Sequence, residues 1–169
     1  MAIIEQPAYR PLDFEDDPDD YRPDSELALV VDPSDGPGPH VEGMSVFCER
    51  MAVGDEIPLH RHREDEVFFL VEGAVEARVG EETREIGPGA VVFIPGGMKH
   101  GFRNVGDEEV RIQAVFSSRE VSIQYFERNP APGTEGDPPG PPLAFDVREL
   151  VEGDPEQAVR PVDPEAFGE

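Results

Sequence analysis

Two histidines lie one residue apart in the segment LHRHREDEVFF, which covers residues 59–69. Successive side chains of a strand point to opposite faces, so His60 and His62 would share one face and could meet a single metal ion. Glu66 has the same parity, but four extended residues span roughly 13 Å, too far for a straight strand. We therefore expect the chain to bend across residues 63–65, so that Glu66 opens the next strand and faces back toward the pair.

A third imidazole is available at His100, directly after the turn PGGM at residues 95–98. Three histidines and one carboxylate form a nitrogen-rich ligand set that suits the divalent metals Fe, Mn, Ni, Cu and Zn. An octahedral ion held in this way keeps open positions for water, dioxygen or a substrate. Each feature alone also fits a solvated strand or a simple turn, and only their combination indicates a metal site. The fourth histidine, His40, lies in a turn-rich segment and is expected to be a loop residue.

The elements that must position these side chains are strands. Short runs of strand-forming residues alternate with turn residues, a pattern typical of an all-β sandwich or barrel. Helical periodicity is absent before residues 143–159, where we expect one short helix. The predicted strands cover residues 27–31, 44–53, 66–73, 74–80, 82–87, 90–95, 99–104, 110–116 and 121–127.

Charge and proline divide the chain into a centre and two ends. The formal net charge is −24; residues 1–40 hold eleven acidic residues and two arginines, and residues 129–169 hold ten and two. Seven prolines lie in the first segment and nine in the last, against three between them. Proline-rich acidic segments stay solvated. The sequence therefore predicts an acidic N-terminal arm at 1–26, a β-barrel at 27–128 and an acidic C-terminal tail at 129–169.

Composition also limits the partners. A strongly acidic chain is a poor ligand for nucleic acid or anionic membranes, and no segment has the length of a signal peptide or a membrane span. We expect a cytoplasmic protein. A homodimer is expected because such arms often lie along an edge strand, sometimes a partner's. A high-salt habitat and codon bias explain the acidity equally well. The lone cysteine, Cys48, excludes an intramolecular disulfide and is predicted to be buried.

Two segments resemble the paired motifs of the cupin superfamily. GDEIPLHRHREDEVFFLVEG matches the first motif and GAVVFIPGGMKHGFRN the second, with every fixed position filled. The resemblance implies an all-β double-stranded β-helix, or jelly-roll barrel, of the small single-domain (cupin 2) type. It also implies that the metal ligands are His60, His62, Glu66 and His100. The remaining motif positions are better interpreted as turn residues: Gly54, Gly73, Gly89, Pro95, Gly97 and Asn104.

Strand parity suggests which side chains line the pocket. Phe68 shares the parity of Glu66, and Phe102 shares the parity of His100. Phe93 and Ile112 are predicted on the inward faces of their own strands. Almost no arginine or lysine is predicted to point inward, which disfavours the phosphate-binding branches of the family.

A fold and a ligand set do not define a substrate. We expect a metal-dependent oxygenase that acts on an apolar or aromatic small molecule, similar to the quercetinase-like cupins. Glu66 would then serve as ligand and general base. The alternatives are a non-catalytic module that binds or senses a small ligand, a sugar isomerase or epimerase, and a decarboxylase, for which Glu49 is the candidate acid.

Overall fold

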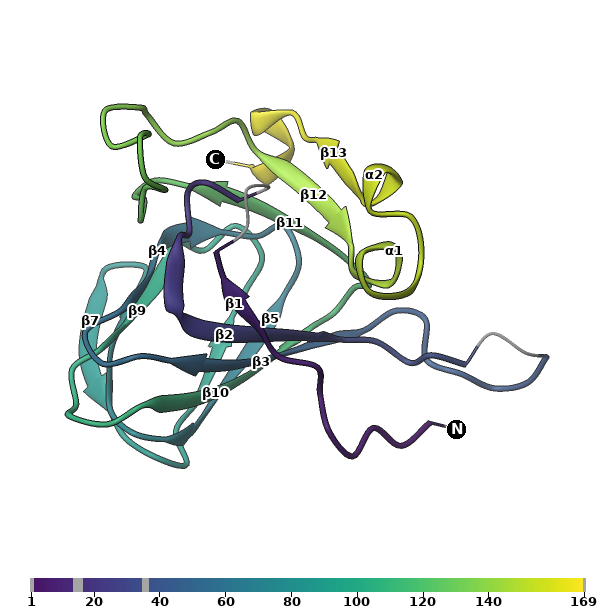
Figure 1. The fold of residues 1–169 in the computed structure, drawn as a ribbon, viewed down its shortest axis with the longest axis horizontal. Coiled ribbons are helices and arrows are strands. Elements are labelled where there is room, and N and C mark those ends of the chain that lie inside the picture. The colour runs from purple at the N-terminus through teal and green to yellow at the C-terminus, as the bar shows by residue number, and fades with distance from the viewer. Residues whose placement is uncertain (1, 14–16, 35–36, 169) are drawn as a thin grey trace.

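The computed structural model describes residues 2–13, 17–34 and 37–168. These residues form two antiparallel sheets (Figure 1). The first sheet has six strands in the order β1-β2-β3-β10-β5-β8. Their bounds are Arg10–Leu12, Arg22–Val30, Ser45–Met51, Val110–Phe116, Glu66–Glu72 and Val91–Ile94.

The second sheet has seven strands in the order β13-β12-β11-β4-β9-β6-β7. The central neighbours in each sheet are distant in sequence, as β10 between β3 and β5 illustrates, so the chain crosses repeatedly from one sheet to the other. The prediction of an all-β fold is confirmed. The strand bounds are Val159–Pro161, Leu143–Asp146, Glu120–Tyr125, Glu56–Arg61, His100–Asn104, Val75–Val79 and Glu82–Ile86.

Alternation along the strands builds the core between the sheets. In β5, Glu66, Phe68 and Leu70 are buried, whereas Phe69 between them is exposed. Phe68 packs in one cluster with Phe102 of the opposite sheet, so apolar burial holds the two sheets together. Gly73 ends β5 with φ of 86°, and a Cβ there would lie 2.7 Å from a side-chain atom of Val110. Only glycine fits this turn.

Segments outside the central strands join both sheets. Strand β2 begins at Arg22, within the segment predicted as an arm, and pairs with β3. Strands β12 and β13 extend the second sheet beyond β11 (Figure 1). The short helices α1 and α2 connect β12 to β13 along the chain. The short helix expected in this region is present as α1, and two further turns accompany it. The helical bounds are Val147–Glu152 for α1, Pro155–Ala158 for α2 and Pro164–Phe167 for the 3₁₀ helix η1.

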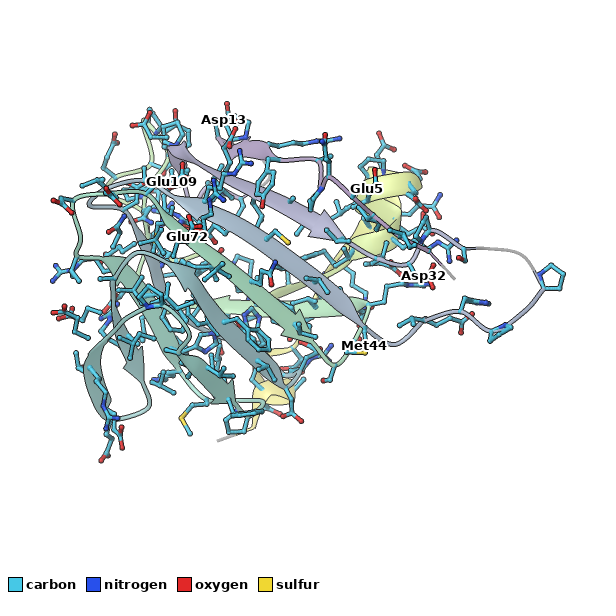
Figure 2. All side chains as sticks on the ribbon, turned by 90° about the horizontal axis from the view of Figure 1, so that it is seen from below. Glu5, Asp13, Asp32, Met44, Glu72 and Glu109 are labelled. Atoms are coloured by element: carbon cyan, nitrogen blue, oxygen red, sulfur yellow. The ribbon has the colours of Figure 1, made fainter. Side chains whose placement is uncertain are left out.

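Figure 2 turns the six-stranded sheet toward the viewer. Glu72 and Glu109, which adjoin β5 and β10, lie at one end of this sheet, and Asp32 and Met44, which adjoin β2 and β3, lie at the other. Cys48 is buried in β3, as predicted. Within the described ranges, no helix has both the length and the apolar character needed to cross a membrane.

Candidate metal centre

Three strands bring the predicted ligands to one place. His60 lies near the end of β4, Glu66 is the first residue of β5 and His100 is the first residue of β9. The chain leaves β4 at Arg61 and enters β5 at Glu66, and it bends at residues 63 and 64, within the predicted 63–65. His60 is also the cross-strand partner of His100. Pairing of β4 with β9 therefore places two imidazoles next to each other.

The four side chains converge in a buried cluster. The ligand atoms of His60, His62 and His100 all lie within 4.8 Å of one another. Nε2 of His60 is 3.0 Å from Nε2 of His62, and Nε2 of His100 is 3.0 Å from Oε2 of Glu66. Oε2 of Glu66 lies 3.7 Å from Nε2 of His62. All four residues are between 1% and 6% exposed, so these atoms are shielded from bulk solvent.

Backbone carbonyls fix the orientation of each imidazole. Nδ1 of His60 donates to the carbonyl of Pro58 at 2.7 Å, and Nδ1 of His100 donates to that of Met98 at 2.9 Å. Nδ1 of His62 donates to the carbonyl of Ser122. A carbonyl only accepts hydrogen bonds, so each Nδ1 carries the proton and each Nε2 presents a lone pair. The sequence could not identify these three acceptors.

This arrangement fits a metal ion better than it fits the side chains alone. With both Nδ1 atoms protonated, the facing Nε2 atoms of His60 and His62 have no proton to share. Oε2 of Glu66 and Nε2 of His100 are buried without a well-aligned hydrogen-bond partner among the described residues. Orphaned buried acceptors are costly, and a divalent cation between them would remove that cost.

The electrostatics of the cluster favour the protonation states in which these side chains can bind a metal ion. Burial lowers the pKa of His60 well below its usual range, and the charges of His100 and His62 add to this effect. Burial also lowers the pKa of His62, against the opposing charge of Glu66. Burial would raise the pKa of Glu66, but close contact with His100 and the charge of His62 lower it below its ordinary value. Neutral imidazoles and an ionised carboxylate are the forms that bind metals.

The turn before His100 packs tightly onto the bend after His62. A Cβ on Gly96 would lie 2.2 Å from the carbonyl oxygen of Arg63, so no side chain fits there. The backbone N–H of Gly97 donates to the carbonyl of His62 at 2.6 Å, and that of Gly96 donates to Asp65 at 2.9 Å. These contacts tie β9 to the bend. They keep His100 at a fixed distance from His62.

The cluster lies in the wall of a cavity of about 320 Å³. Phe68, Phe102 and Ile112 line this cavity, as strand parity predicts. The rings of Phe68 and Phe102 stack with centroids 3.9 Å apart. Phe47 and Glu49 line it too, so this face of β3 points toward the cavity.

Phe93 is placed elsewhere, and the prediction that it lines the pocket does not hold. It is 75% exposed and is not part of the cavity wall. The register of β8 against β5 pairs Phe68 with Val92 and Glu66 with Ile94. Cross-strand partners share a face, so Val92 and Ile94 point inward and Phe93 points outward. The sequence of β8 is apolar on both faces and could not reveal which face is buried.

A charged part of the cavity wall was not predicted from the sequence. Arg22 lines the cavity and is buried, contrary to the expectation that almost no base points inward. Its Nε and Nη2 each donate to Asp20 at 2.7 Å, and its Nη1 contacts Glu49. Next to this cluster, the hydroxyl of Tyr125 donates to Asp17 at 2.8 Å. The register shift between Pro11 and Leu12, where β1 pairs with β2, breaks the alternation that would have marked Arg22.

The comparisons with known proteins agree with this fold. The cupin domain family matches residues 47–116, and the chain belongs to this family. A solved structure of the polyketide cyclase RemF from Streptomyces resistomycificus superposes with a TM-score of 0.54 at 20% identity, covering 77% of this chain and 82% of that one. The predicted jelly-roll fold of a small cupin is thus confirmed. Its three buried histidines could bind a metal ion.

Two curated relatives are similar over the central part of the chain. The polyketide synthase CurC of Streptomyces cyaneus is 41% identical over 63 residues, which are 37% of this chain and 41% of that protein. The 5-nitrosalicylic acid 1,2-dioxygenase of a Bradyrhizobium species is 27% identical over 73 residues, which are 43% of this chain and 35% of that protein. The similarity covers less than half of either relative.

Proposed function

We propose that this cupin is a metal-dependent oxygenase that acts on an apolar or aromatic small molecule. The observation that carries the proposal is the position of the histidine cluster: three imidazoles and a carboxylate converge on one point in the wall of a largely apolar cavity. The ligands would be His60, His62, Glu66 and His100. The similarity to a dioxygenase of an aromatic acid supports the same reaction class.

Each part of the site has a role in this proposal. A bound first-row ion would supply Lewis acidity and redox chemistry at its open positions. The carboxylate of Glu66 contacts the imidazoles of His62 and His100, and in its ionised form it would take a proton from a substrate hydroxyl. Phe68 and Phe102 line the cavity with apolar side chains, which would exclude water from the site.

The charged cluster does not favour the phosphate-binding alternatives. Arg22 uses its Nε and both terminal nitrogens on Asp20 and Glu49, and it leaves little donor capacity for a phosphate. Arg10, the other arginine in the cavity wall, lies in an exposed position. A sugar-phosphate isomerase or epimerase is therefore disfavoured. Glu49 is occupied by the same arginine, so it is a poor acid for a decarboxylase.

A second candidate is a step in polyketide synthesis, and the 41% identity with CurC favours it. It would use the same ligands and the same apolar cavity on a poly-oxygenated substrate, with no uptake of oxygen. The non-catalytic binding module differs from both because its ligand would be released unchanged. The predicted homodimer stays a prediction.

Metal analysis combined with oxygen uptake tests the proposal. The purified protein should contain a divalent metal, and uptake should follow addition of a flavonol, a catechol or a diketone. His100→Ala should remove most of the metal, since a ligand contributes at least the roughly 10–100-fold affinity typical of its supporting neighbours. His40→Ala is the matched control because His40 lies outside the cluster and its ring contacts Gly38 and Glu42.

Full metal occupancy in the His100→Ala variant would show that the ligand assignment is wrong. A metal-loaded protein with no uptake on any of these compounds would favour the polyketide step or the binding module.

A further inference from the structure

Segments on both sides of the matched domain contribute to the cavity wall. Residues 47–116 supply the metal cluster, but the wall continues onto β2 through Leu27 and Leu29. It also continues onto the C-terminal segment through Phe145, Leu150 and Val159. The cavity therefore has two ends with different origins. We call them the metal end and the arm end, the latter formed by these five residues.

A continuous aromatic wall joins the two ends. The ring of Phe116 meets His62 edge-on with centroids 5.0 Å apart. Phe47 lies 4.6 Å from Phe116, and Phe145 of β12 stacks on Phe47 at 6.1 Å. All three phenylalanines line the cavity. An aromatic surface thus runs from a proposed ligand of the metal to the strand that pairs with β13.

The apolar side chains of the arm end favour binding of an apolar part of a ligand. Its five residues carry no polar side-chain atom, and Val159 is the direct cross-strand partner of Phe145. A single-ring compound bound at the metal end would leave this surface in contact with water. The cavity volume of about 320 Å³ falls at the lower end of the roughly 300–1,000 Å³ of sites for drug-sized ligands.

We propose that the arm end is a second subsite that makes the protein selective for multi-ring aromatic substrates. The oxygen-bearing end of the substrate would reach His60, His62 and His100, and its apolar end would lie against Phe145, Leu150 and Val159. This inference rests on the proposed function, because it assumes that a substrate oxygen is held at the metal end. Selectivity then resides in segments outside residues 47–116.

Two test compounds report separately on binding at the metal end and at the arm end. Quercetin has three rings and catechol has one, and both carry adjacent oxygens that can bind a metal. Titration of the metal-loaded protein with each probe, followed by absorbance, gives two dissociation constants. Wild-type protein should bind quercetin more tightly than catechol, because only quercetin reaches the arm end.

Val159→Asp places a charge in the arm end. It should weaken quercetin binding about tenfold or more, because a carboxylate would face an apolar ring. Catechol binding and metal content should stay within about twofold of wild type. Val105→Asp is the matched control: Val105 is 40% exposed and Val159 is 42% exposed, but Val105 does not line the cavity. Leu150→Ala is a milder second variant, and it should weaken quercetin binding alone by a smaller factor.

Equal loss of both probes in Val159→Asp, or no loss of quercetin in either variant, would overturn the subsite while leaving the metal centre intact. Wild-type protein that binds catechol as tightly as quercetin would overturn it as well. If metal-loaded wild type bound neither probe, the proposed function would fail and the subsite with it.

Discussion

The two ends of the cavity differ in how they are built. At the metal end, His60, His62 and His100 come from one continuous stretch of strands, are buried, and are each oriented by a backbone carbonyl. At the arm end, Phe145 and Val159 come from a segment beyond that stretch, and Val159 is half exposed. One end is fixed by the core of the barrel. The other is fixed by contacts between distant segments.

Polar contacts also tie the N-terminal segment to the segment that follows β11. Arg128 donates through Nη1 to the carbonyls of Thr134 and Asp137 at 2.7 and 2.8 Å, and through Nη2 to the carbonyl of Pro18 at 3.2 Å. Its Nε pairs with Asp19 at 2.5 Å. One side chain thus ties the N-terminal and C-terminal segments together. The difference teaches that two parts of one cavity wall can be held in place by different sets of contacts.

The largest effect on stability is expected at the metal end. Phe68→Ala removes a fully buried ring that stacks on Phe102, and it should lower the free energy of unfolding by about 3–5 kcal/mol. Phe93→Ala removes a ring of the same size from the outer face, and it should change stability by less than about 0.5 kcal/mol. Denaturant unfolding of the metal-free protein measures both. Similar losses in the two variants would mean that the inner and outer faces of this sheet are not distinguished by burial.

The residues of the metal end could be predicted from the sequence, whereas those of the arm end could not. At the metal end, spacing and strand parity indicated that His60, His62 and Glu66 lie close together, and the resemblance to the cupin motifs implied that they form one ligand set with His100. Phe93 shows the limit of the same argument: β8 is apolar on both faces, and only its pairing with β5 decides which face is buried. The buried charge of Arg22 could not be predicted, because it depends on Glu49, which is 27 residues away, and on a register shift against β1. Composition described the ends as solvated arms, and it carried no sign that Leu150 or Val159 lines the cavity.

A smaller effect is expected where the two segments are tied together. Arg128→Ala leaves the carboxylate of Asp19 buried without its partner, and it should destabilise the protein by about 3 kcal/mol. Arg160→Ala is the matched control, since Arg160 pairs with Glu120 at the surface and its loss should cost less than about 1 kcal/mol. Limited proteolysis should cut the Arg128→Ala variant faster within residues 129–142, with the metal content unchanged. Equal proteolysis of the two variants would show that Arg128 does not hold residues 129–142 against the N-terminal segment.

The smallest effect is a pH dependence from Asp17, which lines the cavity beside Tyr125. Burial and the charge of Asp20 raise the pKa of Asp17 from 3.8 to about 6. A raised carboxyl pKa means that ionisation is unfavourable in the folded state, so the contribution of Asp17 to stability is largest below about pH 4 and is lost as the pH rises through about 6. Asp17→Asn removes this loss and keeps an oxygen that can accept from Tyr125. Between about pH 4.5 and about pH 8, the stability of the variant relative to wild type should therefore increase by about 2 kcal/mol.

Tyr125→Phe separates burial from hydrogen bonding at this position. The hydrogen bond from Tyr125 lowers the pKa of Asp17 and so opposes the effect of burial. Without the hydroxyl, the pKa should rise further and the loss of stability toward higher pH should become steeper, whereas in Asp17→Asn it should become shallower. Urea unfolding at a series of pH values distinguishes the two directions. If both variants flattened the profile, the hydrogen bond rather than burial would control the ionisation of Asp17.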